Sequence, residues 1–136
     1  MGIDFGTRRF GISISDPGGV VAGNPSVIDV KSEKQAITKI KELVEREAIE
    51  EIVVGLPLSL SGISGPQAEK AADFALRLSS ACGIKVVLWD ERLSTVEAER
   101  ILMGSTRRAR RKKETRDQIA AVIVLQSYLD RRGRSA

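Results

Sequence analysis

A chain of 136 residues is about one domain long, and its content of 42% hydrophobic and 29% charged residues is ordinary for a soluble globular protein. One cysteine and no histidine exclude internal disulfides, multi-cysteine zinc sites and imidazole catalysis, so an enzyme of this composition must work through carboxylates. The net charge of +4 is uneven, because residues 107–136 hold ten Lys/Arg against three Asp/Glu, and such asymmetry points to a polyanionic partner.

The first predicted element is a short strand, GIDFGT (residues 2–7), with an aspartate where a buried strand usually carries an aliphatic residue. Because strand side chains alternate between faces, Asp4 shares its face with Gly2 and Gly6. Glycine weakens a strand unless something approaches the backbone closely, and a carboxylate removed from water needs a partner or a metal. Asp4 is therefore either half of a structural ion pair or part of a site.

Two more strands and a helix are expected next. FGISIS (10–15) alternates apolar and small residues, which predicts an antiparallel hairpin with the first strand, and SVIDV (26–30) follows a turn-rich loop. Ser32 with Gln35 three residues later has the spacing of a capping box, and apolar residues then recur at helical intervals. We expect this helix to end near Ala48.

The second half of the chain predicts crossover connections. EIVVGLP (51–57) is a continuous apolar run, typical of a strand covered on both faces, and IKVVLWD (84–90) is its expected neighbour. An alanine-rich helix over 66–82 lies between them, so the two strands should be parallel with a right-handed crossover. A capped helix over 94–103 and a last helix from Thr115 complete a mixed α/β sheet with helices on both faces.

Acidic residues fall at three notable positions. Asp4 lies on the first strand, Asp90 and Glu91 close the last strand, and Asp117 lies in the first turn of the last helix. Each has a structural explanation, namely an ion pair or, for Asp117, a charge that complements the helix dipole. Together, and with a polyanionic partner, carboxylates from separate elements favour Mg²⁺ or Mn²⁺, and two such ions ~3.5–4 Å apart can hydrolyse a phosphodiester.

Two segments have alternative interpretations. LSLSGISGP (58–66) is either a flexible connection with proline at the first helical position or a loop that offers backbone N–H groups to phosphate. RRARRKK (107–113) is either a solvated loop or a segment whose six positive charges contact phosphates without reading sequence.

Four stretches, GIDFGTRRFGISISDP, IVVGLPLSLSGISGPQAE, WDERLSTVEAERIL and RDQIAAVIVLQSYLD, resemble the successive blocks of the YqgF/RuvX family of pre-16S ribosomal RNA nucleases. The resemblance covers nearly the whole chain and implies a single RNase H-like domain over residues 1–136, with a five-stranded mixed sheet in the order 3-2-1-4-5. It implies that Asp4, Glu91 and Asp117 are the catalytic, metal-binding acids. Asp90 is the fallback, because alternation puts Asp90 and Glu91 on opposite faces of the strand.

The resemblance further implies a nuclease of structured RNA that uses two Mg²⁺ or Mn²⁺ ions and processes the 5′ end of pre-16S ribosomal RNA, with RNA favoured over DNA and ribosomal precursor particles as partners. The alternatives are a Holliday-junction-type DNA resolvase and a non-catalytic nucleic-acid-binding or assembly module. DFGT also resembles the phosphate-binding turn of actin-like ATPases, which need two such domains, so this alternative ranks last.

The expected setting is the cytoplasm, because no apolar run approaches the ~20 residues that span a bilayer and no signal pattern opens the chain. The residues expected to contact nucleic acid belong to the first turn, the loop at 58–66, the end of the last strand and the basic segment; they are Thr7, Arg8, Arg9, Ser61, Gly62, Arg92, Arg107, Arg108, Arg110, Arg111, Lys112 and Lys113.

Overall fold

The structure is a computed structural model that describes residues 1–6, 8–56, 66–90 and 113–135. Its elements, in chain order, are β1 (Gly2–Asp4), β2 (Arg9–Ser15), β3 (Ala22–Asp29), α1 (Glu33–Arg46), β4 (Glu51–Leu56), α2 (Pro66–Cys82), β5 (Lys85–Asp90) and α5 (Lys113–Ser135). The helix predicted over 94–103 lies outside the described residues. None of the described helices has the length and apolar character needed to cross a membrane.

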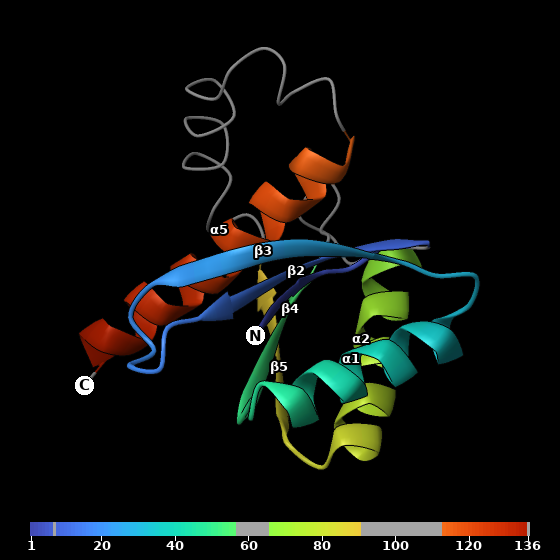
Figure 1. Cartoon of the computed structure of the whole chain (residues 1–136), viewed down its shortest axis with the longest axis horizontal. Helices are drawn as coiled ribbons and strands as arrows, with labels where there is room; N and C mark the ends of the chain where they lie inside the picture. The colour runs from blue at the N-terminus through green and yellow to red at the C-terminus, as the bar shows by residue number, and fades with distance from the viewer. Residues whose placement is uncertain (7, 57–65, 91–112, 136) are drawn as a thin grey trace.

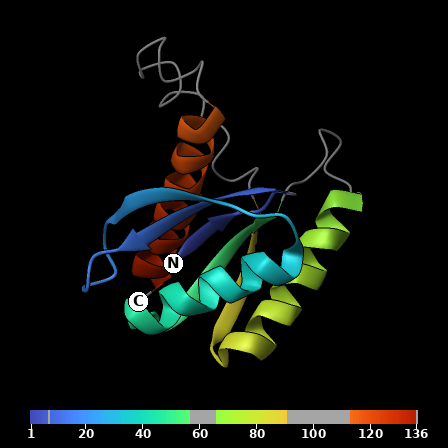
Figure 2. The same ribbon diagram turned by 45° about the vertical axis from the view of Figure 1, so that its right-hand side comes forward.

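The five strands form one mixed sheet in the order β3-β2-β1-β4-β5, which confirms the predicted topology. β1 is the central strand, antiparallel to β2 on one side and parallel to β4 on the other. β3 pairs antiparallel with β2, and β5 pairs parallel with β4. Helices α1 and α2 cover one face of the sheet and α5 crosses the other, as Figure 1 and the turned view in Figure 2 show.

Two hydrophobic clusters hold these layers together. The larger one joins the sheet to α1 and α2, and its fully buried members include Ile3, Phe10 and Phe74. The smaller one joins Val53 to Val124 and Leu125 of α5. Neighbouring residues of β4 thus enter different clusters, which confirms that the apolar run of this strand is covered on both faces.

Helix α1 forms where the capping pattern predicts it. The Ser32 side chain accepts a hydrogen bond from the Gln35 backbone N–H at 3.1 Å, and the Gln35 side chain accepts one from the Lys31 N–H at 2.7 Å. The helix ends at Arg46, and Ala48 has a φ of 51°, a left-handed conformation that a helix cannot continue through.

Several element boundaries differ from the sequence prediction, and three of the differences are informative. β1 ends at Asp4, because Gly6 belongs to a turn so tight that a Cβ there would lie 2.1 Å from the Arg9 carbonyl oxygen. β3 begins at Ala22, four residues early, because its pairing with β2 continues past an irregularity between Ile12 and Ile14. α5 begins at Lys113 rather than Thr115.

Helix α5 lies unusually close to the central strand. A Cβ on Gly2 would be 2.6 Å from the Leu125 Cβ and 3.0 Å from the Ala121 carbonyl oxygen. The residue opposite Gly2 in β2 is also small: Ser13 is fully buried, and its hydroxyl donates to the Gly23 carbonyl at 2.7 Å. Small residues on this face therefore set the distance between α5 and the sheet.

We predict that Gly2→Ala lowers the free energy of unfolding by ~1–3 kcal/mol, because the added methyl group overpacks against Leu125 and the Ala121 backbone. Gly23→Ala is the matched control: the nearest atom to its added Cβ is the Ile14 carbonyl oxygen at 4.0 Å, so its stability should stay within ~0.5 kcal/mol of wild type. Urea unfolding measures both variants, and equal stability of the two would contradict the close approach.

Candidate functional site

Asp4 lies between two glycines across the sheet. In the register of the strands, Asp4 is opposite Gly11 of β2 on one side and Gly55 of β4 on the other. Residues paired across neighbouring strands share a face of the sheet. The half-buried carboxylate of Asp4 therefore has no side chain directly beside it on either neighbouring strand.

The glycines on Asp4's own strand have other reasons to be glycine. Gly2 is required by the close approach of α5, and Gly6 by the turn that ends β1. The expectation that glycine leaves room for a ligand at Asp4 therefore rests on the cross-strand pair, Gly11 and Gly55, which the sequence alone did not single out.

The register of β5 identifies which face carries Asp4. Gly55 pairs with both Asp4 and Trp89, so these two residues share a face. Trp89 packs against the α5 cluster, stacks on Tyr128 with ring centroids 5.3 Å apart, and donates from its indole nitrogen to the Ser127 hydroxyl at 3.1 Å. Asp4 is thus on the α5 face of the sheet, and Asp90 follows Trp89 in a register position opposite Leu56.

The first turns of α5 lie near the end of β1. Ala121 and Leu125 lie over Gly2, whereas Tyr128 and Arg132 bind Glu51 at the start of β4. Because β4 is parallel to β1, α5 runs opposite in direction to β1. Asp117 is one helical turn before Ala121, so its backbone position lies toward the end of β1 that carries Asp4. Glu91 lies outside the described residues, as do the side chains of Asp90 and Asp117. Within the described part, no three acidic or cysteine side chains gather to hold a metal.

Among the predicted nucleic-acid contacts, two arginines are described. Arg8 is exposed, and its carbonyl accepts the Val30 N–H at 2.8 Å, which ties the turn after β1 to the end of β3. Arg9 is half-buried, and its Nε lies 3.8 Å from a carboxylate oxygen of Asp29, so it has a structural partner. The other predicted contacts, Thr7, Ser61, Gly62, Arg92, Arg107, Arg108, Arg110, Arg111 and Lys112, lie outside the described residues, as does the Lys113 side chain.

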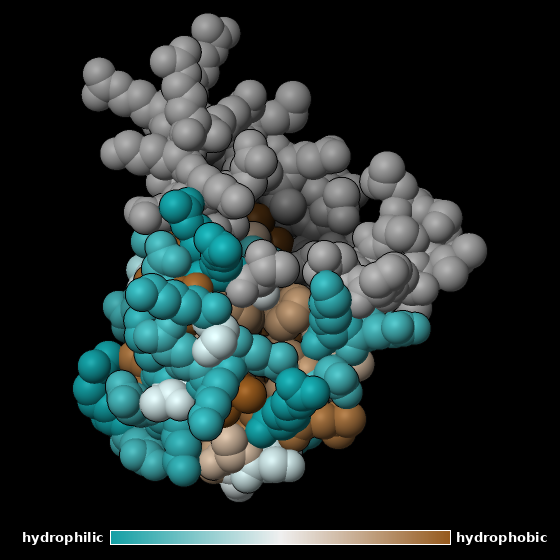
Figure 3. Space-filling view, turned by 90° about the vertical axis from the view of Figure 1, so that its right-hand side faces the viewer, coloured by the Kyte–Doolittle hydropathy of each residue, from teal (hydrophilic) through white to brown (hydrophobic). Residues whose placement is uncertain are grey.

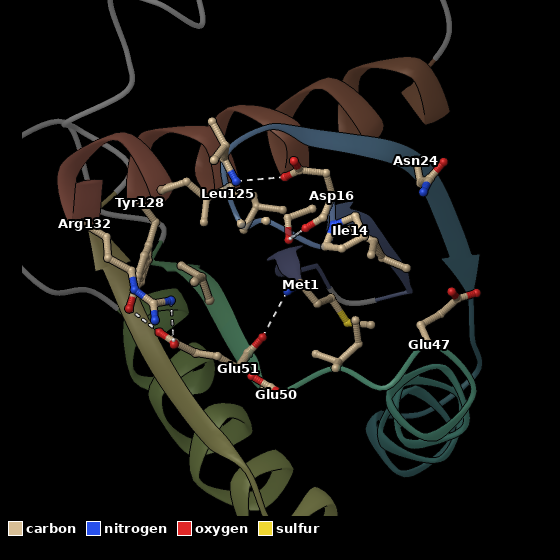
Figure 4. A pocket seen from close by; sticks show the side chains of 18 of the residues that line it. Met1, Ile14, Asp16, Asn24, Glu47, Glu50, Glu51, Leu125, Tyr128 and Arg132 are labelled. Atoms are coloured by element: carbon tan, nitrogen blue, oxygen red, sulfur yellow. Dashed lines mark hydrogen bonds and ion pairs between the residues drawn. The ribbon is translucent and has the colours of Figure 1, made fainter. Parts of the chain in front are cut away.

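A cavity of about 1100 Å³ lies at the opposite end of the sheet, where β1 and β4 begin (Figure 4). On its α5 side the Tyr128 hydroxyl donates to one oxygen of Glu51, and Arg132 donates to the other at 3.1 Å. Burial and the bond to Glu51 raise the pKa of the Tyr128 phenol. Sequence reasoning missed this cavity, because its lining comes from separate segments with no common motif.

A mixed sheet in this order, with an acid on its central strand, defines an RNase H-like α/β fold. The solved structure of Thermus thermophilus RuvC in complex with a Holliday junction substrate has the same fold: it superposes with a TM-score of 0.56 over 97% of this chain and 94% of that chain, at 17% sequence identity. The match is of fold alone, because the identity is so low.

The family model of RuvX, described as Holliday junction resolvase, matches residues 1–131, and the chain belongs to this family. A relative from Pelotomaculum thermopropionicum is 43% identical over 135 residues, which cover 98% of this chain and 88% of that protein. One from Syntrophomonas wolfei is 44% identical over 130 residues, which cover 96% and 92% of the two chains. Both relatives carry the name "Putative pre-16S rRNA nuclease".

Proposed function

We propose that this protein is a metal-dependent phosphodiester hydrolase, a single RNase H-like domain that cleaves structured RNA in the processing of the 5′ end of pre-16S ribosomal RNA. Its place of action is the cytoplasm, on ribosomal precursor particles. The observation that carries the proposal is Asp4, a carboxylate on the central strand between two cross-strand glycines. The names of relatives at 43–44% identity support the substrate.

The surroundings of Asp4 fit a hard divalent cation. Carboxylate oxygens are the ligands that Mg²⁺ and Mn²⁺ prefer, and the glycines opposite Asp4 place no side chain beside it that would compete for such an ion. Two ions, when bound, supply an activated water and stabilise the leaving oxygen of an in-line displacement. Asp4 would hold them together with Glu91 and Asp117.

Strand alternation favours Glu91 over Asp90 as the second acid. Trp89 and Asp4 share the α5 face, and the period of a strand is two. The position two residues after Trp89 is Glu91, whereas Asp90 takes the odd position between them. The third acid, Asp117, belongs to the helix that covers the same face.

The basic segment 107–113 supplies substrate binding in this proposal. It leads into α5, whose first residue is Lys113 and whose first turns lie toward the end of β1 that carries Asp4. Lysine and arginine bind phosphates irrespective of sequence and so position a strand without reading it. The exposed Arg8, in the turn after β1, is placed to contribute a further phosphate contact at the same end.

A Holliday-junction-type resolvase is the second candidate, favoured by the description of the family model. The chemistry is the same for both candidates, because each hydrolyses a phosphodiester. Purified protein with Mg²⁺ or Mn²⁺ should therefore be incubated with a structured RNA, a single-stranded RNA and a four-way DNA junction of matched length. Cleavage of the structured RNA alone is expected; cleavage of the junction alone would replace the proposal with the second candidate, and no cleavage of any substrate would favour a non-catalytic binding module.

We predict that Asp4→Asn abolishes cleavage and removes the stabilisation that Mg²⁺ gives to the folded protein. A ligand that binds only the folded state, present at 100 times its dissociation constant, stabilises that state by ~2.7 kcal/mol. The neutral amide of the variant does not attract the cation, so the variant loses this stabilisation. The measurement pairs thermal melting with and without Mg²⁺ with cleavage of a structured RNA. Without metal, the variant should melt at or above the wild-type temperature, because one of three neighbouring negative charges is gone.

The structural interpretation of Asp4 predicts the opposite sign. If Asp4 were half of a buried ion pair, the variant would leave a buried cation and lose ~3–5 kcal/mol even without metal. Asp73→Asn is a matched control, because Asp73 is an exposed acid on α2, on the other face of the sheet, paired at 3.7 Å with Arg77. It should keep both cleavage and the response to Mg²⁺.

We also predict that replacing Arg107, Arg108, Arg110 and Arg111 with alanine weakens RNA binding and flattens its salt dependence. Each lost phosphate contact lowers the log–log salt slope by ~0.7–0.9. A control with the same charge change replaces four cations away from this segment, namely Lys41, Arg46, Lys85 and Arg131. Filter binding at several salt concentrations measures both variants, and equal slopes would show that net charge alone drives binding.

A further inference from the structure

The cavity at the start of β1 and β4 has an apolar floor. Figure 4 shows Met1 at its centre, with Leu125 and Tyr128 of α5 on one side and the end of α1 on the other. Ile14, Ile49, Val53 and Leu129 complete the apolar lining. Its volume of about 1100 Å³ is slightly above the ~300–1,000 Å³ typical of ligand pockets.

The rim of this cavity is acidic, although the chain as a whole is basic. The charged side chains that line it are one arginine, Arg132, and five carboxylates, Asp16, Glu47, Glu50, Glu51 and Asp130. Asp16, Glu47 and Glu51 stand around the floor in Figure 4. Such a concentration of one sign of charge in a concave surface attracts cations and repels polyanions. Nucleic acid is therefore a poor occupant of this end of the molecule.

The acids of the rim fall into two groups. Asp16, Glu51 and Asp130 are held in place: Asp16 accepts the N–H groups of Val20 and Val21 at 2.8 and 2.9 Å, and Glu51 binds Tyr128 and Arg132. Asp130 accepts the side-chain amide of Gln126 at 2.8 Å. The bonds to Val21 and Val20 keep the pKa of Asp16 below its usual value, so it stays charged. Glu47 and Glu50 are exposed. The Glu47 carboxylate lies 3.5 Å from the Arg46 Nε in a surface ion pair, and Glu50 makes no hydrogen bond or ion pair within the described residues. Because exposed ion pairs are weak, both glutamates are available to a ligand.

The rim also carries exposed apolar surface. Val20, which lines the cavity, is 64% exposed, and its neighbour Val21 is 56% exposed. They are the most exposed valines in the described part of the chain, and they lie in the connection between β2 and β3. A ligand that buries these valines and also pairs with the acids of the rim needs aliphatic groups as well as positive charge.

We propose that this cavity docks a basic polypeptide segment of another protein, one in which lysine or arginine alternates with aliphatic residues. The charge complementarity with the five carboxylates selects the cations, and the apolar floor with Val20 receives the aliphatic side chains. The proposal does not depend on the nuclease function. The cavity and Asp4 are at opposite ends of β1, so the segment and a nucleic acid bind at the same time.

The test uses the full chain and a labelled peptide of alternating arginine and leucine, without nucleic acid. Fluorescence anisotropy gives its affinity, and the emission of Trp89, the only tryptophan, reports on the site, because Trp89 stacks on Tyr128 of the cavity wall. The double variant Glu47→Lys, Glu50→Lys should weaken binding about tenfold, since two attractions become repulsions. Peptides with every arginine changed to glutamate, or every leucine to serine, should bind less tightly by a similar factor.

The matched control is Glu42→Lys, Glu45→Lys, which makes the same charge change at exposed positions of α1 outside the cavity lining. It should bind the peptide within about twofold of wild type. Equal weakening in both double variants, unchanged Trp89 emission on binding, or no binding of the arginine–leucine peptide would each overturn the proposal. So would RNA that competes with the peptide for the wild type. Cleavage of structured RNA by Glu47→Lys, Glu50→Lys should equal that of wild type, so the two proposals fail separately.

Discussion

The contact between α5 and the central strand governs the rest of the structure. Gly2 has no side chain, and the helix backbone occupies the space where one would be, with the Ala121 carbonyl oxygen 3.0 Å from the missing Cβ. The close approach fixes the height and direction of a 23-residue helix over the sheet. One end of that helix lies toward Asp4, and the other contributes Tyr128 and Arg132 to the acidic cavity. Two small residues, Gly2 on β1 and Ser13 on β2, thus position α5 relative to both the Asp4 end of the sheet and the acidic cavity.

The charged residues around the two ends of α5 come from different segments of the chain. The segment before the helix is strongly basic, whereas its last turns meet carboxylates from the connections after β2 and α1. A polyanion that approaches such a molecule is attracted to one end and repelled from the other. On the proposed function, such a charge distribution orients a nucleic acid before any specific contact forms. Net charge alone, at +4, conceals this polarity.

Much of the fold was predictable from local patterns. The continuous apolar run of β4, the capping box at Ser32 and the alanine face of α2 each specify an element whose burial follows from its period. The register was not predictable from these patterns. The register depends on pairings between separate segments of the sequence. These pairings make Gly11 and Gly55 the neighbours of Asp4, and they put Trp89 on its face, at separations of about 7, 50 and 85 residues. The acidic cavity was missed for the same reason, because its residues come together only through the folded sheet.

The position of Asp4 in the sheet follows from strand order. β1 is the one described strand with an antiparallel neighbour on one side and a parallel neighbour on the other, so the sheet changes direction beside it. At such a point the connections of the two halves lead away from each other and leave a crevice beyond the carboxyl end of the strand. β1 ends at Asp4 because Gly6 turns the chain at once, so the carboxylate lies at the carboxyl end of the strand rather than in the middle of a longer strand. Topology thus makes the last residue of the shortest described strand the natural position for a ligand-binding acid.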